Sequence, residues 1–224
     1  MDKTKKKFFI SIEDEPGQVF KNPWLEKLTR THISIPVGMF FLYAAGLIWY
    51  TKVATDLSNT LIIALFFGGW FLFTFAEYVI HRYAYHPPEE YELSSKIAQT
   101  IHGVHHDYPK SKKRLALPPL LTVVVGTILL FLFELILDKY SFSSLAGFMV
   151  GYAFYLLVHY AVHIFRPPNN FLKKLWANHA IHHYSNNEIL YGVSSPLWDY
   201  IFRTLPNTKD KDRVKIYVKE GEPV

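Results

Sequence analysis

The chain has 224 residues, of which half are hydrophobic and 17% are aromatic, and its formal net charge is +5. This length allows a sizeable core, and the absence of cysteine excludes thiolate metal sites, iron–sulfur clusters and disulfides. The positive charge does not indicate nucleic-acid binding, because its distribution along the chain is typical of a membrane protein.

Residues 1–32 are predicted to form a cytosolic tail and an interfacial helix. The first 20 residues are basic and then acidic, and they lack the apolar run of a cleavable signal peptide. Asn22 and Pro23 then open a short amphipathic stretch over residues 24–28. Its tryptophan, close to lysines, is typical of a membrane–water boundary, and a solvated helix packed on the domain fits nearly as well.

Four apolar runs follow, over residues 33–50, 58–80, 115–137 and 142–165. They are 18 to 24 residues long, and a helix needs about 20 residues to cross the hydrocarbon layer. Helices that are apolar on every side at this length are membrane spans more often than core helices. The short connections between paired runs predict two antiparallel hairpins. We therefore expect an all-α integral membrane protein with four transmembrane helices.

The basic residues predict the orientation of these spans. If all four runs cross, 22 of the 24 lysines and arginines lie on one side, and basic residues favour the cytosolic side. Both termini are then cytosolic, in a bacterial inner membrane or the endoplasmic reticulum. Residues 33–224 form the membrane domain, and segments 81–116 and 166–224 form a cytosolic helical cap.

Histidines are grouped in a pattern that occurs twice. Ten of the eleven histidines fall into four groups, and corresponding groups in the two halves start 77 or 78 positions apart. Imidazole is the commonest neutral metal ligand, so two matching sets of five predict two metal ions side by side. The ten predicted ligands are His81, His86, His102, His105, His106, His159, His163, His179, His182 and His183.

Helical geometry predicts how these histidines meet. Residues i, i+3 and i+4 share a helix face, so the members of each His-x-x-His-His group are expected to converge. His159 and His163 are one turn apart and are expected to converge too. His81 and His86 would lie roughly 140° apart on an ideal α-helix, so we expect the helix to open there.

Carboxylates are expected to support the metal ligands. Histidine ligands alone accept zinc, iron, copper or nickel, and acidic side chains often accept the outer ring N–H of a ligating histidine. Glu77, one turn before His81, is the best candidate, because an ionisable residue inside a span is usually functional. Asp107 and Asp199 are weaker candidates. Glu134 lies near the other end of its span and is interpreted as a snorkelling or paired carboxylate.

Several motifs around these residues resemble a known family. The segments EYVIHRYAYH (77–86), IHGVHH (101–106), RLALPP (114–119), NHAIHH (178–183) and YGVSSPLWD (191–199) resemble the fatty acid hydroxylase superfamily. Within it, the chain is most similar to the fatty acid 2-hydroxylases of sphingolipid synthesis. The resemblance covers about residues 20 to 205 and includes every histidine group.

This resemblance implies a di-iron mono-oxygenase that hydroxylates a fatty acyl chain at the carbon next to the carbonyl. Its partners would be a lipid substrate, dioxygen and a cytochrome- or ferredoxin-type electron donor. That donor is expected to be a separate protein, because only about 32 residues precede the first span. Iron is expected as the active metal, because zinc has no redox chemistry, although zinc can occupy a purified sample. No catalytic residue is expected beyond the metal ligands.

Four positions depart from the 2-hydroxylase pattern. Leu156 and Ser111 replace expected acidic residues, Ile164 replaces a histidine, and Arg203 replaces a usual glycine. None of these changes removes a predicted ligand, so they bear on the substrate and not on metal binding. Two alternatives remain: a sterol or carotenoid hydroxylase or desaturase of the same superfamily, and a non-enzymatic metal carrier.

Overall fold

The computed structural model describes residues 9–88 and 90–219, and every regular element in that part of the chain is helical. The α-helices are α1 (Pro23–Leu28), α2 (Ser34–Ala54), α3 (Asn59–Val79), α4 (Glu92–Ala98), α5 (Val104–Asp107), α6 (Pro119–Leu137), α7 (Ser141–Ile164), α8 (Lys173–Tyr184), α9 (Leu197–Ile201) and α10 (Thr208–Lys219). Two π-helices, η1 (Ile80–Tyr85) and η2 (Gln99–Gly103), and the 3₁₀-helix η3 (Asp138–Tyr140) complete the set. The all-helical prediction is confirmed for these residues.

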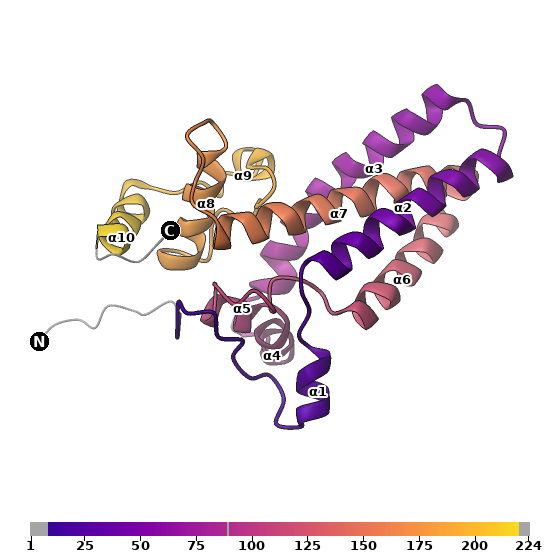
Figure 1. The fold of residues 1–224 in the computed structure, drawn as a ribbon. Coiled ribbons are helices and arrows are strands. Elements are labelled where there is room, and N and C mark those ends of the chain that lie inside the picture. Colours follow the sequence, from indigo (N-terminus) through magenta and orange to yellow (C-terminus); the bar gives the residue numbers. More distant parts are fainter. Residues whose placement is uncertain (1–8, 89, 220–224) are drawn as a thin grey trace, which may run out of the picture.

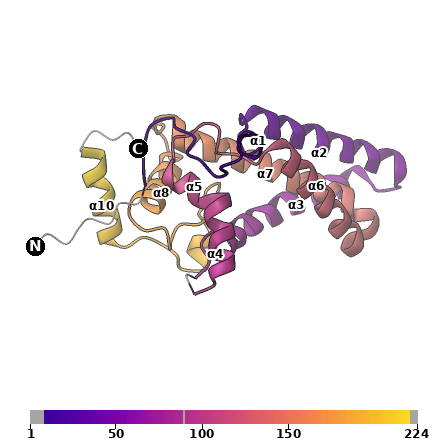
Figure 2. The same cartoon turned by 90° about the horizontal axis from the view of Figure 1, so that it is seen from below.

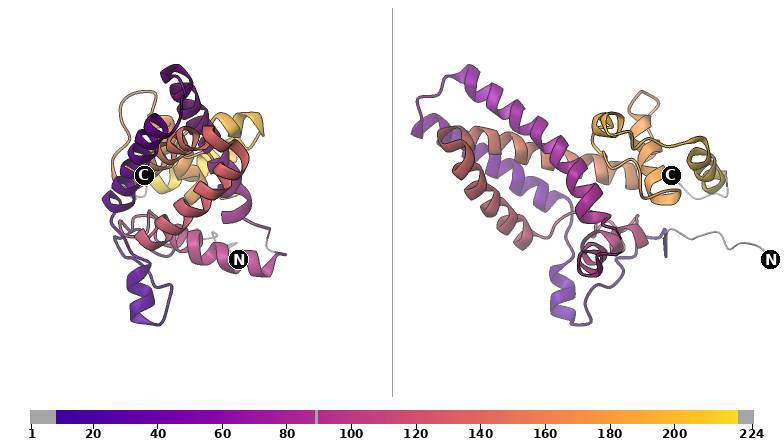
Figure 3. Two further views of the ribbon diagram at one scale, coloured as in Figure 1. Left: turned by 90° about the vertical axis from the view of Figure 1, so that its right-hand side faces the viewer. Right: turned by 180° about the vertical axis from the view of Figure 1, so that it is seen from behind.

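The four long helices lie together at one end of the molecule, and the shorter helices α4, α5, α8, α9 and α10 lie at the other (Figure 1). Helix α7 is central, because it packs against α2, α3 and α6. Its Leu145, Ala146, Met149 and Ala153 have no exposed surface. The view from behind, on the right of Figure 3, shows the same division between the long helices and the compact end.

Helices α3 and α7 approach so closely that only glycine fits at their contact. A Cβ atom on Gly69 would lie 1.8 Å from the carbonyl oxygen of Ser144, and one on Gly147 would lie 1.8 Å from that of Phe66. Small residues permit such close backbone contact between membrane helices. Both helices end at the compact end of the molecule, and this contact therefore fixes where their histidine-bearing ends lie (Figure 1).

Three continuous helical stretches are long and apolar enough to cross a membrane: Ser34–Ala54, Asn59–Tyr85 and Pro119–Ile164. Their outer surfaces expose large apolar side chains; Leu42 is 76% exposed and Leu135 is 83% exposed. Four separate spans are not confirmed, because α6, η3 and α7 follow one another without a non-helical residue. Asp138 nevertheless has a positive φ of 47°, and α6 packs against α7.

The helix opens where the histidine spacing predicted it. Residues Ile80–Tyr85 continue α3 as a π-helix, whose hydrogen bonds join residues five apart. His81 and His86 are five residues apart, so this wider turn brings them to one side of the chain. A second π-helix, Gln99–Gly103, leads into α5. The compact end that these turns form is seen from below in Figure 2.

Candidate metal centre

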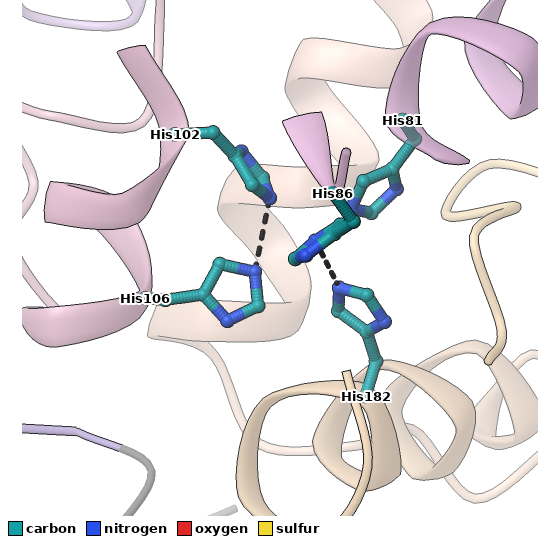
Figure 4. Close-up of side chains that lie close together, drawn as sticks. All are labelled: His81, His86, His102, His106 and His182. Carbon is teal, nitrogen blue, oxygen red and sulfur yellow. Dashed lines mark hydrogen bonds between the residues drawn. The ribbon is translucent and has the colours of Figure 1, made fainter. Parts of the chain in front are cut away.

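The ten predicted ligands form two clusters of five. Within each cluster one nitrogen from every imidazole lies within 4.8 Å of the others. The early cluster, drawn in Figure 4, consists of His81, His86, His102, His106 and His182. The late cluster consists of His105, His159, His163, His179 and His183. His86 is partly exposed and the other nine histidines are buried.

The two halves of the chain exchange one histidine each. His105 belongs to the early sequence group but lies in the late cluster, and His182 makes the opposite exchange. Consecutive helical residues are rotated by about 100°, so adjacent histidines face different clusters, whereas residues four apart differ by only about 40°. The three histidines of each group therefore do not converge as expected. The i, i+4 pair lies in one cluster, and the histidine between them in the sequence lies in the other.

The clusters adjoin one another. The rings of His106 and His183 stack with their centroids 4.0 Å apart and their planes 14° apart. His106 belongs to the early cluster and His183 to the late one. The ring pairs of the two sequence neighbours, at 5.8 Å for His105–His106 and 5.6 Å for His182–His183, also connect the clusters. The arrangement thus offers two neighbouring cation sites.

Backbone carbonyls orient the imidazoles of the early cluster. The Nδ1 atom of His81 lies 2.7 Å from the carbonyl oxygen of Tyr191, and Nδ1 of His182 lies 2.7 Å from that of Ile189. A carbonyl accepts a hydrogen bond only from a protonated nitrogen, so Nε2 of each ring carries the lone pair. Nε2 of His182 is 3.2 Å from Nε2 of His86, inside the cluster (Figure 4).

The late cluster contains buried nitrogens that lack a partner. Nε2 of His163 lies 2.7 Å from Nε2 of His179 and 3.3 Å from Nε2 of His159. Among the described residues, neither ring nitrogen of His105 or His183 has a hydrogen-bond partner. Buried polar atoms without partners are costly and rare. A metal ion would satisfy several of these nitrogens at once, so the residues present fit such an ion.

The electrostatic environment keeps these imidazoles neutral. Burial, followed by neighbouring imidazoles, holds the pKa of His102, His106 and His179 well below the ordinary value of 6.5. Burial lowers the pKa of His182 to about 4 and, together with His182, the pKa of His86 to about 2. Neutral imidazole is the form that binds metal, so no proton has to be displaced near pH 7.

Glu77 holds a loop and does not contact an imidazole directly. Its Oε1 atom accepts the N–H groups of Val193 at 2.6 Å and Ser194 at 2.8 Å, and its Oε2 atom accepts the Ser194 hydroxyl. We expected this carboxylate to accept the outer N–H of a histidine, and the carbonyl of Tyr191 takes that place for His81. Glu77 therefore acts on the early cluster through the loop at residues 189–194.

Asp199 holds the same loop from its other side. Its two carboxylate oxygens accept the N–H groups of Tyr191 and Gly192, each at 2.9 Å, and Thr204 donates its hydroxyl at 2.7 Å. Asp107 lies apart from this arrangement: its side chain accepts a hydrogen bond from Gln99 at 3.0 Å. Two of the three predicted carboxylates thus support the loop that orients His81 and His182.

Sequence reasoning missed the backbone of this loop. The carbonyls of Ile189 and Tyr191 have no side-chain signature that could have identified them. The structure also shows why Gly192 is in this loop: a Cβ atom there would lie 2.1 Å from the carbonyl oxygen of Ser195 and 2.8 Å from Oδ2 of Asp199. Only glycine fits that position without moving the loop.

A small cavity lies beside both clusters, with a volume of about 70 Å³. His102 of the early cluster and His105 and His159 of the late cluster are on its wall. The remaining lining residues are mainly aromatic or apolar: Tyr85, Ile101, Leu115, Ala116, Leu117, Tyr152, Tyr155 and Leu156, with Arg114 among them. An apolar ligand in this cavity would contact imidazoles from both clusters.

The chain is similar to known hydroxylases. The fatty acid hydroxylase family matches residues 66–204. The ceramide very long chain fatty acid hydroxylase scs7 of Schizosaccharomyces pombe is 34% identical over 193 residues, covering 81% of this chain and 53% of its own length. The dihydroceramide fatty acyl 2-hydroxylase FAH1 of Arabidopsis thaliana is 32% identical over 208 residues, covering 89% of this chain and 84% of its own.

A solved structure agrees with these sequence matches. The hydroxylase domain of full-length scs7p superimposes with a TM-score of 0.74 at 30% identity, covering 84% of this chain and 71% of that one. The chain spans about half the length of several relatives, including the first named above. The family match includes all ten histidines of the two clusters, on a helical fold that the solved relative shares. This chain therefore belongs to the fatty acid hydroxylase family.

Proposed function

We propose that this protein is a membrane mono-oxygenase that hydroxylates a fatty acyl chain, of a free fatty acid or a sphingolipid, at the carbon next to the carbonyl. The early and late clusters would each hold one iron ion, with zinc able to occupy the sites in a purified sample. The names of the relatives support the reaction, and the separation of ten imidazoles into two adjoining clusters supports a pair of metals.

The cavity beside the clusters carries this proposal. It has apolar and aromatic walls and imidazoles from both clusters on one side. At about 70 Å³ it has room only for the reacting end of an acyl chain, since sites that enclose whole ligands are several times larger. The rest of the chain would stay in the membrane. Leu156, which departs from the 2-hydroxylase pattern, lies on the cavity wall and bears on which chain fits.

The residues of this chain position the reactants. A saturated C–H bond has no acidic proton, so a redox metal pair supplies the activation of dioxygen that side chains alone cannot provide. One oxygen atom enters the C–H bond, and the other leaves as water with two protons and two electrons from an external cytochrome- or ferredoxin-type donor. The loop carbonyls keep His81 and His182 oriented, and the apolar walls exclude water from the reacting carbon.

The membrane arrangement follows from the same proposal. We infer that Pro119–Ile164 crosses twice, as α6 and α7, which makes four spans in two hairpins. The positive φ of Asp138 and the packing of α6 on α7 support this turn. With four spans, 22 of the 24 basic residues lie on the side of the termini and the cap, which supports a cytosolic location for both. Residues 1–32 would then form the tail and interfacial helix that precede the membrane domain.

Lipid mass spectrometry tests the activity. The protein is expressed in a host without 2-hydroxylated lipids, and acyl chains are analysed for one added oxygen and for its position. We expect a 2-hydroxy product with the wild-type protein and none with His105→Ala or His182→Ala, provided that each variant reaches the membrane in equal amount. A changed sterol or carotenoid, with unchanged acyl chains, would instead support another oxygenase of the superfamily. Metal binding without any oxidised product would support a carrier.

A further inference from the structure

A second and much larger cavity lies away from the metal centre, between the N-terminal segment and the first turns of two membrane helices. Its volume is about 670 Å³, and it is open to the surface. Ile35 in α2 and Pro119 in α6 form part of its wall, and Pro23 and Lys27 contribute from α1. The cavity is therefore at the level where two apolar helices begin, at Ser34 and Pro119.

This cavity is lined by an excess of basic groups. Lys21, Lys27, Arg30 and Lys113 are on its wall, together with His32, which is the one histidine outside the two clusters. The three lysines are exposed. Within residues 9–88 and 90–219, none of the three forms an ion pair. Their charges are thus available to an external anion.

The single acidic group of the cavity is already occupied. Glu26 accepts N–H groups of Val19 and Phe20, each at 2.9 Å, and it forms ion pairs with Arg30 and Arg114. Burial alone would raise the pKa of this carboxyl, but these hydrogen bonds and the charge of Arg114 outweigh it and lower the pKa to about 2. Glu26 therefore stays charged and fixes the cavity wall without neutralising the lysines.

Apolar side chains of α1 and α2 indicate where the anion comes from. Trp24, Leu25 and Leu28 of α1 are 77%, 48% and 60% exposed, although they are not on the cavity wall. Ile35, at the start of α2, is 48% exposed and lines the cavity itself. Tryptophan and leucine beside lysines suit the boundary between headgroups and acyl chains. A lipid in the cavity would contact the lysines with its headgroup and Ile35 with its apolar part, whereas a soluble anion has no apolar part.

We propose that this cavity binds the phosphate-bearing headgroup of an anionic membrane phospholipid, with Lys21, Lys27 and Lys113 contacting the phosphate and its acyl chains lying along the exposed faces of α2 and α6. Basic residues next to a membrane attract anionic lipids, and each charge adds to the affinity. The site would anchor the N-terminal segment to the bilayer. It is separate from the hydroxylation chemistry, because none of its lining residues is a clustered histidine.

Native mass spectrometry of the full chain in detergent tests this site. The probes are phosphatidylglycerol, phosphatidylcholine with the same acyl chains, and inorganic phosphate. We expect the wild-type protein to retain phosphatidylglycerol over phosphatidylcholine by about tenfold or more. The variant Lys21→Ala/Lys27→Ala/Lys113→Ala should lose this preference. A control, Lys173→Ala/Lys209→Ala/Lys211→Ala, removes the same charge from exposed positions elsewhere and should keep it.

Three outcomes would overturn the proposal: equal preference in the wild-type protein and the cavity variant, equal loss in both triple variants, or displacement of phosphatidylglycerol by an equal concentration of inorganic phosphate. The second would indicate general surface attraction, and the third would indicate a site for soluble phosphate. Helix content and metal per chain report folding of each variant. If the triple variant is not folded, Lys27→Gln/Lys113→Gln provides the same comparison with less perturbation.

Discussion

The early and late clusters contain the same number of imidazoles but are held in place differently. In the early cluster, carbonyls of the 189–194 loop orient His81 and His182, and carboxylates in turn hold that loop. In the late cluster, His159 and His163 come from the central helix α7 and His179 and His183 from α8, and the backbone that contacts His159 belongs to a different loop, at Leu115. Substitutions in the 189–194 loop should therefore weaken one metal site and spare the other.

The largest expected effect tests whether His105 belongs to the late cluster or to the early one. His105→Ala/His106→Ala removes one ligand from each cluster, whereas His102→Ala/His106→Ala removes two from the early cluster alone. We expect the first variant to lose both metals and the second to keep about one per chain. Elemental analysis of protein purified under identical conditions measures this. Equal metal content in the two variants would show that His105 does not belong to the late cluster.

A methyl group in the loop should remove metal from the early cluster alone. In Gly192→Ala the added Cβ atom would meet the carbonyl oxygen of Ser195 at 2.1 Å, so the loop must move. We expect metal affinity at the early cluster to fall about 10- to 100-fold, as when other groups that orient ligands are altered. Gly38→Ala is the matched control, because its Cβ atom meets nothing within 4 Å. Loss of both metals, or of neither, would contradict the assignment.

Neutralising a carboxylate under the loop should have a smaller effect of the same kind. Glu77→Gln keeps one oxygen as an acceptor for Val193 and Ser194 but removes the charge. We expect roughly tenfold faster loss of one metal ion to a chelator, with the second ion retained as in the wild-type protein. Time-resolved chelation with a chromogenic dye follows both ions. Unchanged release kinetics would remove Glu77 from the support of the metal centre.

The smallest effect on the clusters is expected from Glu26, which holds the N-terminal segment. Glu26→Gln should leave both metals bound and reduce hydrogen-exchange protection around residues 17–31. The folded-state pKa is about 2 against an ordinary value of 4.5, so the stabilisation is complete above about pH 4.5 and is lost as the pH falls through 2. The difference in protection between wild type and variant should therefore be larger at pH 7 than at pH 3. A pH-independent difference would contradict this origin.

Much of the clustering of the histidines was predictable because their spacing carries geometric information. The repeat identified all ten clustered residues, and the five-residue step from His81 to His86 required the wider helical turn that the structure contains. The placement of His105 and His182 in the opposite clusters also follows from the helical rotation between neighbours, although it becomes evident only when both groups are considered together.

Arg203, at a usual glycine position, has a positive φ of 59°, the region that glycine adopts freely.

The rest depended on tertiary contacts that leave no local pattern. Backbone carbonyls are present at every position, so nothing distinguishes those of Ile189 and Tyr191 before the chain folds. Glu77 was recognised by its cost inside an apolar helix, but its partner, more than 100 positions away, could not be deduced. The lipid-sized cavity near α1 likewise needs residues 18–35 to meet Lys113 and Pro119. Spacing along one helix predicts a face, and it cannot predict what meets that face.

The exchanged histidines have a consequence for biosynthesis. A nascent chain that has not yet reached α8 lacks His182, so its early cluster is one ligand short, and its late cluster lacks His179 and His183 as well. For the proposed pair of ions, full coordination of either one therefore waits until α8 has been synthesised. A chain that terminates before α8 contains neither five-histidine cluster in complete form.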